Sequence, residues 1–516
     1  MSKRSVTELQ SSSTHGQSFS KVSSSGARRP SGVDTSEMGE FEDAWEDDIE
    51  SDEDVVDRKE GDDDEEGMDV DEVLPPIEES EEQESVQKDI FIPGRHVLGK
   101  DEILEPDDSV YEMRHSMNVI WPCLSFDVLR DNLGDERQRY PASAYIVAGT
   151  QADVAKNNEL SVYKMSSLHR TQKDGDDLDS DDDGDDDDNN LDEDAVLEHR
   201  SVPHLGGVNR IRAQPLPPSA SLPPVSSPYY VASWAETGKV HIWDVRPLIE
   251  SFDVPGYTFD KKRTNTPTYT VNAHGRTEGF AMDWAADSAN SAALRLLTGD
   301  IHSKIFLTTA TQTGFATQSQ PYTSHTSSVE DLQWSPAEPT VFASCSADQS
   351  IRIWDIRVKG RKSALAVTPA HESDVNVISW NKLTSYLLLS GGDEGGIKAW
   401  DLRNLSTASP SPSPVASFAW HKAPVTAIEW HPSEDSIFAA SGADNQVTLW
   451  DLSVEQDDDE NGAAMEDDSQ KNVPPQLLFV HQGQKDVKEV HWHPQVPGAV
   501  ISTALDGFNV FKTISV

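Results

Sequence analysis

The feature of this sequence that most limits its fold is a tryptophan spacing that occurs three times. In each case a Trp is followed 20 residues later by a second Trp, and Asp comes directly after the second one. These Trp-Asp pairs lie 46 and 50 residues apart. One blade of a β-propeller usually takes about 40–45 residues, so the excess is expected in loops. The three intervals are Trp334–Trp354, Trp380–Trp400 and Trp430–Trp450.

Inside each unit, runs rich in β-branched and aromatic residues alternate with turn residues, as in VEDLQW, VFASCS and SIRIWDI. A few strands cannot bury both faces of their sheet alone, so several units must pack around one axis. With the weaker copies near YIVAGT and YYVASWAETGKVHIWDV, the units number seven. We therefore predict an all-β fold, a seven-bladed WD-repeat β-propeller. We expect a strand at Trp121–Val128 to complete the last blade and close the ring, because closure removes open sheet edges.

The sequence before the repeats divides into two parts. Residues 1–88 are rich in Ser and acidic residues and hold few residues that could form a core, so we expect a disordered tail. The acidic-aromatic patch around Phe41 and Trp45 is the exception in this tail. Residues 89–128 are expected to hold a helix over Asp107–Met117 and the closing strand. The propeller is assigned to residues 129–516, with acidic insertions at 172–196 and 455–472.

The net charge of −49 is concentrated in three stretches of sequence. Residues 40–84 contain 25 acidic and 2 basic residues, residues 174–194 contain 14 acidic residues, and residues 457–468 contain 7. We call these the three acidic segments. The rest of the chain is close to neutral, so the pattern predicts a folded body with polyanionic attachments, whose natural partner is a basic protein. The acidic side chains of the last segment are Asp457, Asp458, Asp459, Glu460, Glu466, Asp467 and Asp468.

Several function classes are disfavoured. Direct sequence-specific binding to nucleic acid is not expected, because phosphate contacts need clustered Lys and Arg and only short basic runs occur, Lys261–Arg263 and Lys359–Lys362. No apolar run is long enough for a membrane span, and no apolar signal region begins the chain. Two distant cysteines predict no disulfide or zinc site and a reducing compartment. We therefore expect a soluble intracellular protein without cofactor or metal.

The His, Ser, Asp and Trp of the repeats resemble a catalytic triad, but the set recurs in several units, whereas a catalytic set occurs once. We interpret it as a buried hydrogen-bonded network inside each blade. No nucleophile-elbow, P-loop or zinc-protease motif occurs, so we expect no enzyme. His491 and His493, which flank Trp492, are expected in a loop rather than at a metal. The network residues are His325, Ser344, Asp348, Trp354, His371, Trp400, His421, Asp444 and Trp450.

Three blocks of the sequence carry a resemblance to a known family: HSMNVIWPCLSFDVL, PPQLLFVHQGQKDVKEVHWHP and STALDGFNVF. Together with the long acidic segment, they resemble the glutamate-rich WD-repeat family, a ribosome-assembly group related to the retinoblastoma-binding histone-chaperone propellers. The resemblance covers about residues 90–516. It implies a seven-bladed propeller preceded by a helix, with nuclear and nucleolar localisation. It further implies a chaperone that binds a newly made, basic large-subunit ribosomal protein and meets pre-ribosomal particles indirectly.

In the histone-binding relatives, a groove between the helix and an acidic loop ending in Pro-Pro receives a basic helix. The matching pieces here are Asp107–Met117 and the stretch from Asp457 through Pro474 and Pro475 to Leu477, Leu478 and Phe479. The relatives' helix is longer and bears lysines, whereas this stretch carries only Arg114. A histone-binding chromatin protein remains the alternative. A cullin-type ligase receptor is a minor one, based on Trp-Asp-x-Arg at Trp243–Arg246, Trp354–Arg357 and Trp400–Arg403.

Overall fold

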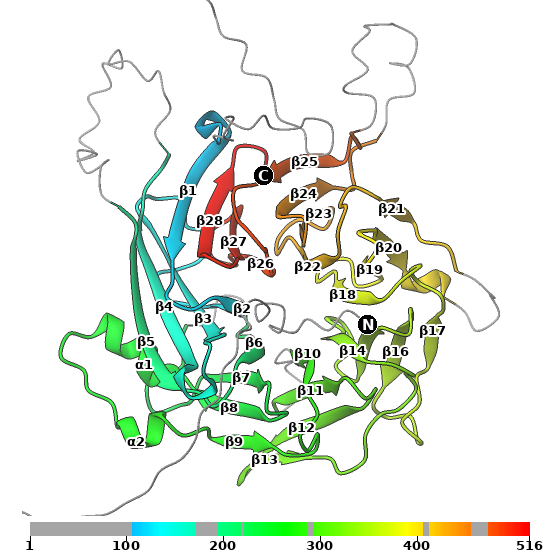
Figure 1. Cartoon of the computed structure of the whole chain (residues 1–516), viewed down its shortest axis with the longest axis horizontal. Coiled ribbons are helices and arrows are strands. Elements are labelled where there is room, and N and C mark those ends of the chain that lie inside the picture. The colour runs from blue at the N-terminus through cyan, green and yellow to red at the C-terminus, as the bar shows by residue number, and fades with distance from the viewer. Residues whose placement is uncertain (1–105, 172–193, 218–220, 286–292, 406–411, 456–472) are drawn as a thin grey trace, which may run out of the picture. The chain divides into compact units, whose positions relative to one another are not determined.

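The computed structural model describes residues 106–171, 194–217, 221–285, 293–405, 412–455 and 473–516. Seven four-stranded antiparallel sheets stand around one central channel in these residues, which confirms the seven-bladed propeller (Figure 1). Inner strands of consecutive blades are neighbours all around the ring, and the last blade contacts the first. None of the helices in the described part of the chain is long and apolar enough to cross a membrane.

Each blade runs from an inner strand at the channel to an outermost strand at the rim, and blades 1 to 6 follow sequence order. The strands of blades 1 to 3 are β2 (Cys123–Leu129), β3 (Ala142–Thr150), β4 (Glu159–Leu168), β5 (Val196–Pro203); β6 (Val208–Ala213), β7 (Tyr230–Ala235), β8 (Val240–Asp244), β9 (Tyr269–Val271); and β10 (Gly279–Trp284), β11 (Arg295–Asp300), β12 (Ile305–Thr311), β13 (Gly314–Thr317).

The strands of blades 4 to 6 are β14 (Val329–Trp334), β15 (Val341–Ser346), β16 (Ile351–Asp355), β17 (Leu365–Val367); β18 (Val375–Trp380), β19 (Leu387–Gly392), β20 (Ile397–Asp401), β21 (Ala416–Phe418); and β22 (Val425–Trp430), β23 (Ile437–Gly442), β24 (Gln446–Asp451), β25 (Leu477–His481). Blade 7 consists of β26 (Glu489–Trp492), β27 (Ala499–Thr503), β28 (Gly507–Thr513) and β1 (Tyr111–Asn118). The short helices are η2 (Asp108–Val110), η3 (Ala155–Asn157), α1 (Arg246–Asp253), α2 (Lys261–Thr264) and η4 (Leu402–Asn404).

Tight turns between the second and third strands keep the blades regular. In five blades the turn contains one residue with a positive φ, and in three of them this residue is not glycine (Ser303, Gln349 and Asn445). Glycine is required at the equivalent Gly395, where φ is +84° and an added Cβ would lie 2.4 Å from the carbonyl oxygen of His421. That close approach brings the turn of blade 5 against the connection that enters blade 6.

The helix expected over Asp107–Met117 is wrong. The structure has one short 3-10 turn, η2, followed by the eight-residue strand β1. Met113 and Met117 fit a helical spacing, but they also fit a period of two that includes Tyr111, and all three side chains are buried. Pairing with β28 along nearly its whole length satisfies the backbone of this segment as a strand.

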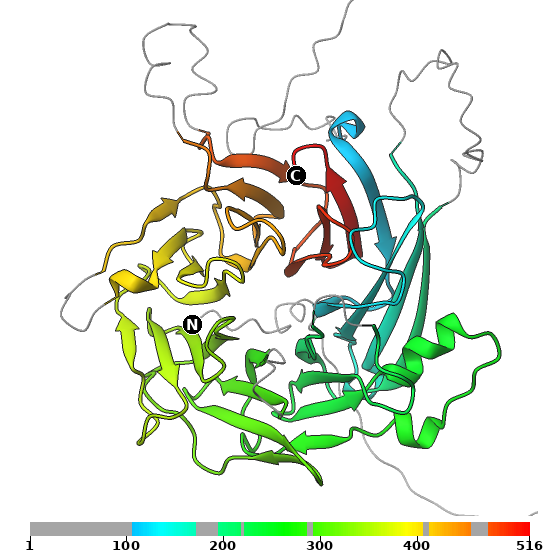
Figure 2. The same cartoon turned by 180° about the vertical axis from the view of Figure 1, so that it is seen from behind.

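Ring closure is achieved by a different strand from the one expected. The sequence around Trp121–Val128 forms β2, which is the inner strand of blade 1, while β1 supplies the outermost strand of blade 7 (Figure 2). The chain therefore enters at the rim of blade 7 and then begins blade 1, so the N-terminal part of the ring is hydrogen-bonded to its C-terminal strand. Met113, Met117, Phe126 and Phe508 belong to one buried cluster across this joint.

Because β1 joins the two ends of the ring, its buried side chains should control the stability of the whole propeller. Met113 is 1% exposed, so Met113→Ala should lower the free energy of unfolding by about 2–4 kcal/mol. Ser116→Ala, an exposed position on the same strand, should change it by less than about 0.5 kcal/mol. Urea denaturation followed by tryptophan fluorescence measures both. Equal effects of the two substitutions would show that β1 does not hold the ring closed.

Candidate functional site

The predicted acidic loop lies mostly outside the described residues, and its end is visible. Asp457, Asp458, Asp459, Glu460, Glu466, Asp467 and Asp468 are not among the described residues. Pro474 and Pro475 form a turn, in which the Pro474 carbonyl accepts a hydrogen bond from Leu477 N at 3.0 Å. Leu477 and Phe479 follow in β25, the outermost strand of blade 6, where both side chains are partly buried.

The structure brings the end of this loop against the N-terminal segment. The ring of Phe479 contacts the ring of Tyr111 edge to face, with centroids 5.3 Å apart. The Tyr111 hydroxyl makes a 2.8 Å hydrogen bond with His481 Nδ1, and His481 Nε2 lies 3.2 Å from the Asn509 amide. Burial, with a smaller effect from Arg114, lowers the pKa of His481 to about 3, so the imidazole is neutral. The two sequence pieces predicted to form one groove therefore meet, but through a strand rather than a helix.

The three acidic segments have related attachment points. In sequence, residues 457–468 lead into β25, residues 40–84 lead toward β1, and residues 174–194 lead into β5. These are the outermost strands of blades 6, 7 and 1, which are consecutive around the ring (Figure 1). The acidic sequence thus joins the propeller on one side of its rim.

The His, Ser, Asp and Trp set of blade 4 forms one hydrogen-bonded chain. His325 Nδ1 lies 3.0 Å from Asp348 Oδ2, His325 Nε2 lies 2.6 Å from Ser344 Oγ, and Trp354 Nε1 donates to Ser344 Oγ at 2.8 Å. Burial lowers the pKa of His325 despite the nearby carboxylate, so the ring is neutral. Every member of the chain is buried or nearly so and ties the connection entering the blade to its middle strands.

Equivalent chains occur in the next two blades with substitutions that sequence reasoning missed. In blade 5, His371 bonds to Glu394 and Ser390, and Trp400 Nε1 donates to Ser390 Oγ at 2.8 Å. In blade 6, His421 bonds to Asp444 and Thr448, and Trp450 Nε1 donates to Thr448 Oγ1 at 2.8 Å. Glu394 replaces the aspartate, and Ser390 or Thr448 supplies the shared hydroxyl. The recurrence favours a structural role for these residues.

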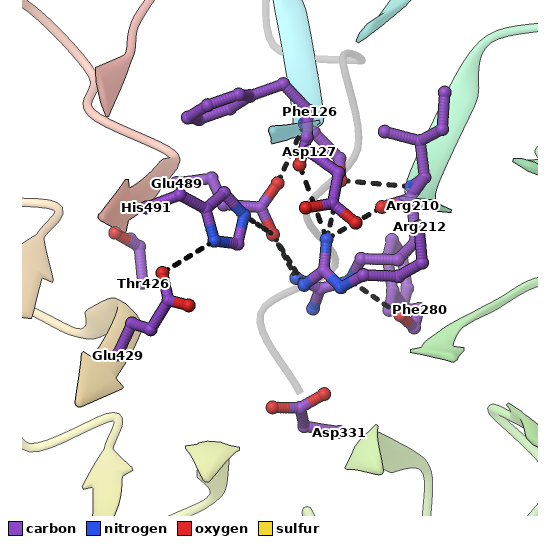
Figure 3. Close-up of polar contacts among 12 residues, drawn as sticks. Phe126, Asp127, Arg210, Arg212, Phe280, Asp331, Thr426, Glu429, Glu489 and His491 are labelled. Carbon is purple, nitrogen blue, oxygen red and sulfur yellow. Dashed lines mark hydrogen bonds and ion pairs between the residues drawn. The ribbon is translucent and has the colours of Figure 1, made fainter. Parts of the chain in front are cut away.

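A second polar cluster, which the sequence did not predict, lies in the central channel (Figure 3). Glu489 of β26 is 1% exposed and accepts hydrogen bonds from Arg210 Nη1 at 2.8 Å and Arg212 Nη2 at 2.7 Å. Its second oxygen accepts from Phe126 N at 2.8 Å. Burial raises the pKa of Glu489, but the two guanidinium groups and His491 outweigh burial and hold it well below its usual value. One carboxylate therefore joins blade 7 to blades 1 and 2.

His491 extends the cluster to blade 6. It lies on β26 rather than in the expected loop, and its Nδ1 is 2.9 Å from Glu429 Oε2, which also accepts from Trp492 N at 3.0 Å. Burial alone would lower the pKa of His491, but the attraction of Glu429 and Glu489 exceeds it and raises that pKa to about 10. The imidazole is thus a buried cation between two carboxylates at neutral pH.

The same type of contact runs around the whole channel. At each junction, a side chain of one inner strand bonds to the backbone of the next inner strand, so all seven junctions carry a polar link. The signal in the sequence is the polar residue directly before several of the inner-strand tryptophans. The links are Asp127–Ala213, Arg210–Phe280, Asp283–Trp334, Asp331–Ile378, Ser379–Trp430, Glu429–Trp492 and Glu489–Phe126.

The Trp-Asp-x-Arg motifs are not equivalent in space. Arg357 and Arg403 are largely exposed and each forms a two-contact ion pair with the Asp of its own motif, Asp355 and Asp401. Arg246 is buried and donates to the Pro223 carbonyl instead. Across the described ranges, no group of three or more His, Cys, Asp or Glu side chains is placed to hold a metal ion. The geometry is that of a binding scaffold.

Comparison with known proteins gives two family matches. Residues 101–169 match the family described by the histone-binding protein RBBP4 and its counterpart in the CAF1 complex. Residues 316–355, 362–401 and 412–451 match the WD domain, G-beta repeat.

Among curated proteins, the chain is 46% identical to ribosome assembly protein rrb1 of Schizosaccharomyces pombe, covering 94% of both chains. It is 41% identical to glutamate-rich WD repeat-containing protein 1 of Dictyostelium discoideum, over 91% of this chain and 93% of that protein. It is 23% identical to histone acetyltransferase type B subunit 2 of Candida glabrata, over 77% of this chain and 83% of that protein.

The charge on His491 should make the stability of the propeller depend on pH. Its pKa is higher in the folded state than in the unfolded chain, so its contribution is complete below about pH 6.5 and is lost as pH rises toward 10. Between pH 7 and 9.5, the free energy of unfolding should fall by up to about 1.4 kcal/mol per pH unit from this group. His491→Gln should flatten that slope, as measured by urea denaturation at several pH values.

The matched control for this experiment is His431→Gln. Burial lowers the pKa of His431 to about 4, so this histidine is neutral in both states over the same pH range. The substitution should therefore lower stability without changing the slope. A slope in His491→Gln equal to that of the unsubstituted chain would mean that His491 is not a buried cation.

Proposed function

Because the chain belongs to the family of glutamate-rich WD-repeat ribosome assembly proteins, we propose that it acts in ribosome biogenesis as an acidic chaperone. The client in this proposal is a newly made, basic protein of the large ribosomal subunit. The role is one of binding rather than catalysis, and its place is the nucleus and, within it, the nucleolus. Pre-ribosomal particles are then contacted through the client.

The observation that carries the proposal is the arrangement of charge on the fold. The three acidic segments supply most of the net charge of −49 and join the ring at consecutive outermost strands. A polyanion of this kind attracts a basic protein over a long range and makes its capture fast. The same electrostatic contacts weaken when salt or a competing polyanion is present, which provides a route for release.

The contact of Tyr111 with Phe479 supplies a place for the client. β1 and the end of the Pro474–Pro475 turn lie side by side there, directly after two of the acidic segments in sequence. Leu477 and Phe479 are partly buried, so they offer apolar surface beside the acidic sequence. A client segment with basic and apolar side chains would be matched by both.

Histone binding is the second candidate, because residues 101–169 match the histone-binding family and include β1. Two observations make it the weaker one. The similarity to the histone acetyltransferase protein is only 23%, and the segment that would correspond to a lysine-bearing helix is a strand whose one lysine or arginine is Arg114. We therefore place the ribosomal client first.

The decisive experiment compares two charge-neutralised chains of unchanged length. In one, the seven acidic residues of 457–468 become the corresponding amides. In the control, seven of the fourteen acidic residues of 174–194 are changed in the same way, so the net charges are equal. Each chain is immobilised and exposed to the total basic proteins of the large ribosomal subunit, and separately to histones H3 and H4, at two salt concentrations.

We expect one large-subunit protein to be retained by the unsubstituted chain, and its affinity to fall about tenfold or more with the 457–468 variant. The control should lose less than half of that effect in free energy, because its substitutions lie two blades away. Retention of histones without a ribosomal protein would favour the second candidate. Equal losses in both variants would show that charge alone, and not this side of blade 6, holds the client.

A further inference from the structure

The outer wall of blades 3 and 4 carries no acidic residue. Residues 301–329 and 356–371 lack Asp and Glu entirely, although about five would be expected at the frequency found outside the three acidic segments. They contain the outermost strands β13 and β17 and the connection between the two blades. Exposed hydroxyl and amide side chains cover this surface; they include Thr311, Gln312, Thr313, Ser319 and Gln320.

A basic loop projects from this wall. Residues 356–364, which we call the basic loop, connect β16 to β17 and contain Arg357, Lys359, Arg361 and Lys362. Arg357 is balanced by Asp355, with Nη2 2.7 Å from Oδ2, so the surplus charge belongs to the other three. Lys359 and Lys362 are exposed.

The basic loop is held in a fixed shape. Arg361 lies over the ring of buried Tyr322, with its guanidinium carbon 5.2 Å from the centroid. Ser363 N donates to Ser324 Oγ at 3.1 Å, and Lys362 Nζ donates to the Thr323 carbonyl. Gly360 has a φ of +92°, which allows the sharp turn between Lys359 and Lys362. The cations are therefore placed by the folded blade, which lowers the entropy lost when a ligand binds.

The basic loop lies across the ring from the acidic attachment points. Blade 4 is three blades away from both blade 7 and blade 1 in the closed ring. Two blades of four strands span at least about 28 Å at the usual strand spacing, without counting the channel. This distance exceeds three Debye lengths of about 8 Å at physiological ionic strength. The basic loop therefore keeps a local positive potential although the chain as a whole is strongly negative.

We propose that the basic loop and the neighbouring acid-free wall bind the phosphate backbone of RNA without reading its sequence. Lys359, Arg361 and Lys362 supply the charge, and the exposed Thr, Ser and Gln side chains supply hydrogen-bond donors, which is the usual composition of a backbone contact. The choice of RNA rests on the proposed function in ribosome assembly. The chain then contacts RNA directly on one side of the ring while the basic client is held on the other.

An RNA backbone suits this surface better than an acidic protein segment does. Phosphates follow each other at regular spacing, and a row of cations and hydroxyl donors along β13 and the basic loop can contact several of them. The exposed side chains offer little apolar surface, apart from Val358, to which the apolar residues of a protein segment would bind. The contact is expected to be weak and salt-dependent, as befits a few phosphate contacts.

The test measures binding of the full chain to a fluorescently labelled single-stranded RNA of about 20 nucleotides by anisotropy. Lys359→Gln with Lys362→Gln should weaken binding about tenfold at about 100 mM salt and lower the salt slope by about 1.4, the value for two lost phosphate contacts. The charge-conserving pair Lys359→Arg with Lys362→Arg should retain binding. Thermal unfolding of each variant verifies that the propeller is intact.

The matched control is Lys261→Gln with Lys262→Gln, which removes the same charge from α2 on blade 2. Its affinity for RNA should change less than twofold. Equal losses in the two glutamine pairs, or no binding by the unsubstituted chain, would overturn the proposal. Tighter binding of a poly-glutamate peptide than of RNA at the basic loop would overturn it in favour of a protein partner.

Client binding, measured on the same preparations, separates this inference from the proposed function. The glutamine pair at Lys359 and Lys362 should leave client binding unchanged, because those residues lie across the ring from β1 and β25. Mapped RNA binding without any ribosomal client would remove the chaperone role and leave the RNA surface in place. Client binding without RNA binding would do the reverse.

Discussion

The constraint on which the structure depends is that no blade can exist alone. A four-stranded sheet that is apolar on both faces must be covered on both, and only a closed ring covers every blade. Glu489 makes that closure specific, since it binds Phe126 N in blade 1 and Arg210 and Arg212 in blade 2. Removing one partner from such a buried ionic group leaves the others uncompensated. The channel cluster therefore links the C-terminal part of the chain to the beginning of the ring.

Closure also determines where the chain can carry long insertions. The inner strands hold the polar links and the middle strands hold the His–Ser–Trp chains, so both are occupied by contacts that an insertion would break. The outermost strands pair on one edge only. Chain that enters an outermost strand leaves these contacts intact, and this is where the acidic segments join β25, β1 and β5. The position of the acidic sequence follows from the tolerance of the rim.

The seven-bladed fold is predictable because the Trp334–Trp354 type of interval reflects local structure within one blade. The link between Glu489 and Arg210 is not, because it depends on which strands meet after 279 residues of intervening chain, and no local pattern records that. The segment at Met113 is ambiguous for another reason. Its apolar spacing fits both a helix and a strand, and only pairing with β28 decides between them. The strand position of His491 also escapes local reasoning, because its partner, Glu429, belongs to another blade.

The propeller separates charges that would otherwise neutralise each other. A basic client and RNA attract each other strongly, so a chaperone must keep them apart and still allow transfer between them. A near-neutral ring wider than several Debye lengths achieves both, because each side acts on its own ligand. Had the acidic residues been spread over the blades, their mutual repulsion would have destabilised the ring and cancelled the potential of the basic loop. Concentrating them in segments that join three consecutive blades leaves the opposite rim free for a polyanion.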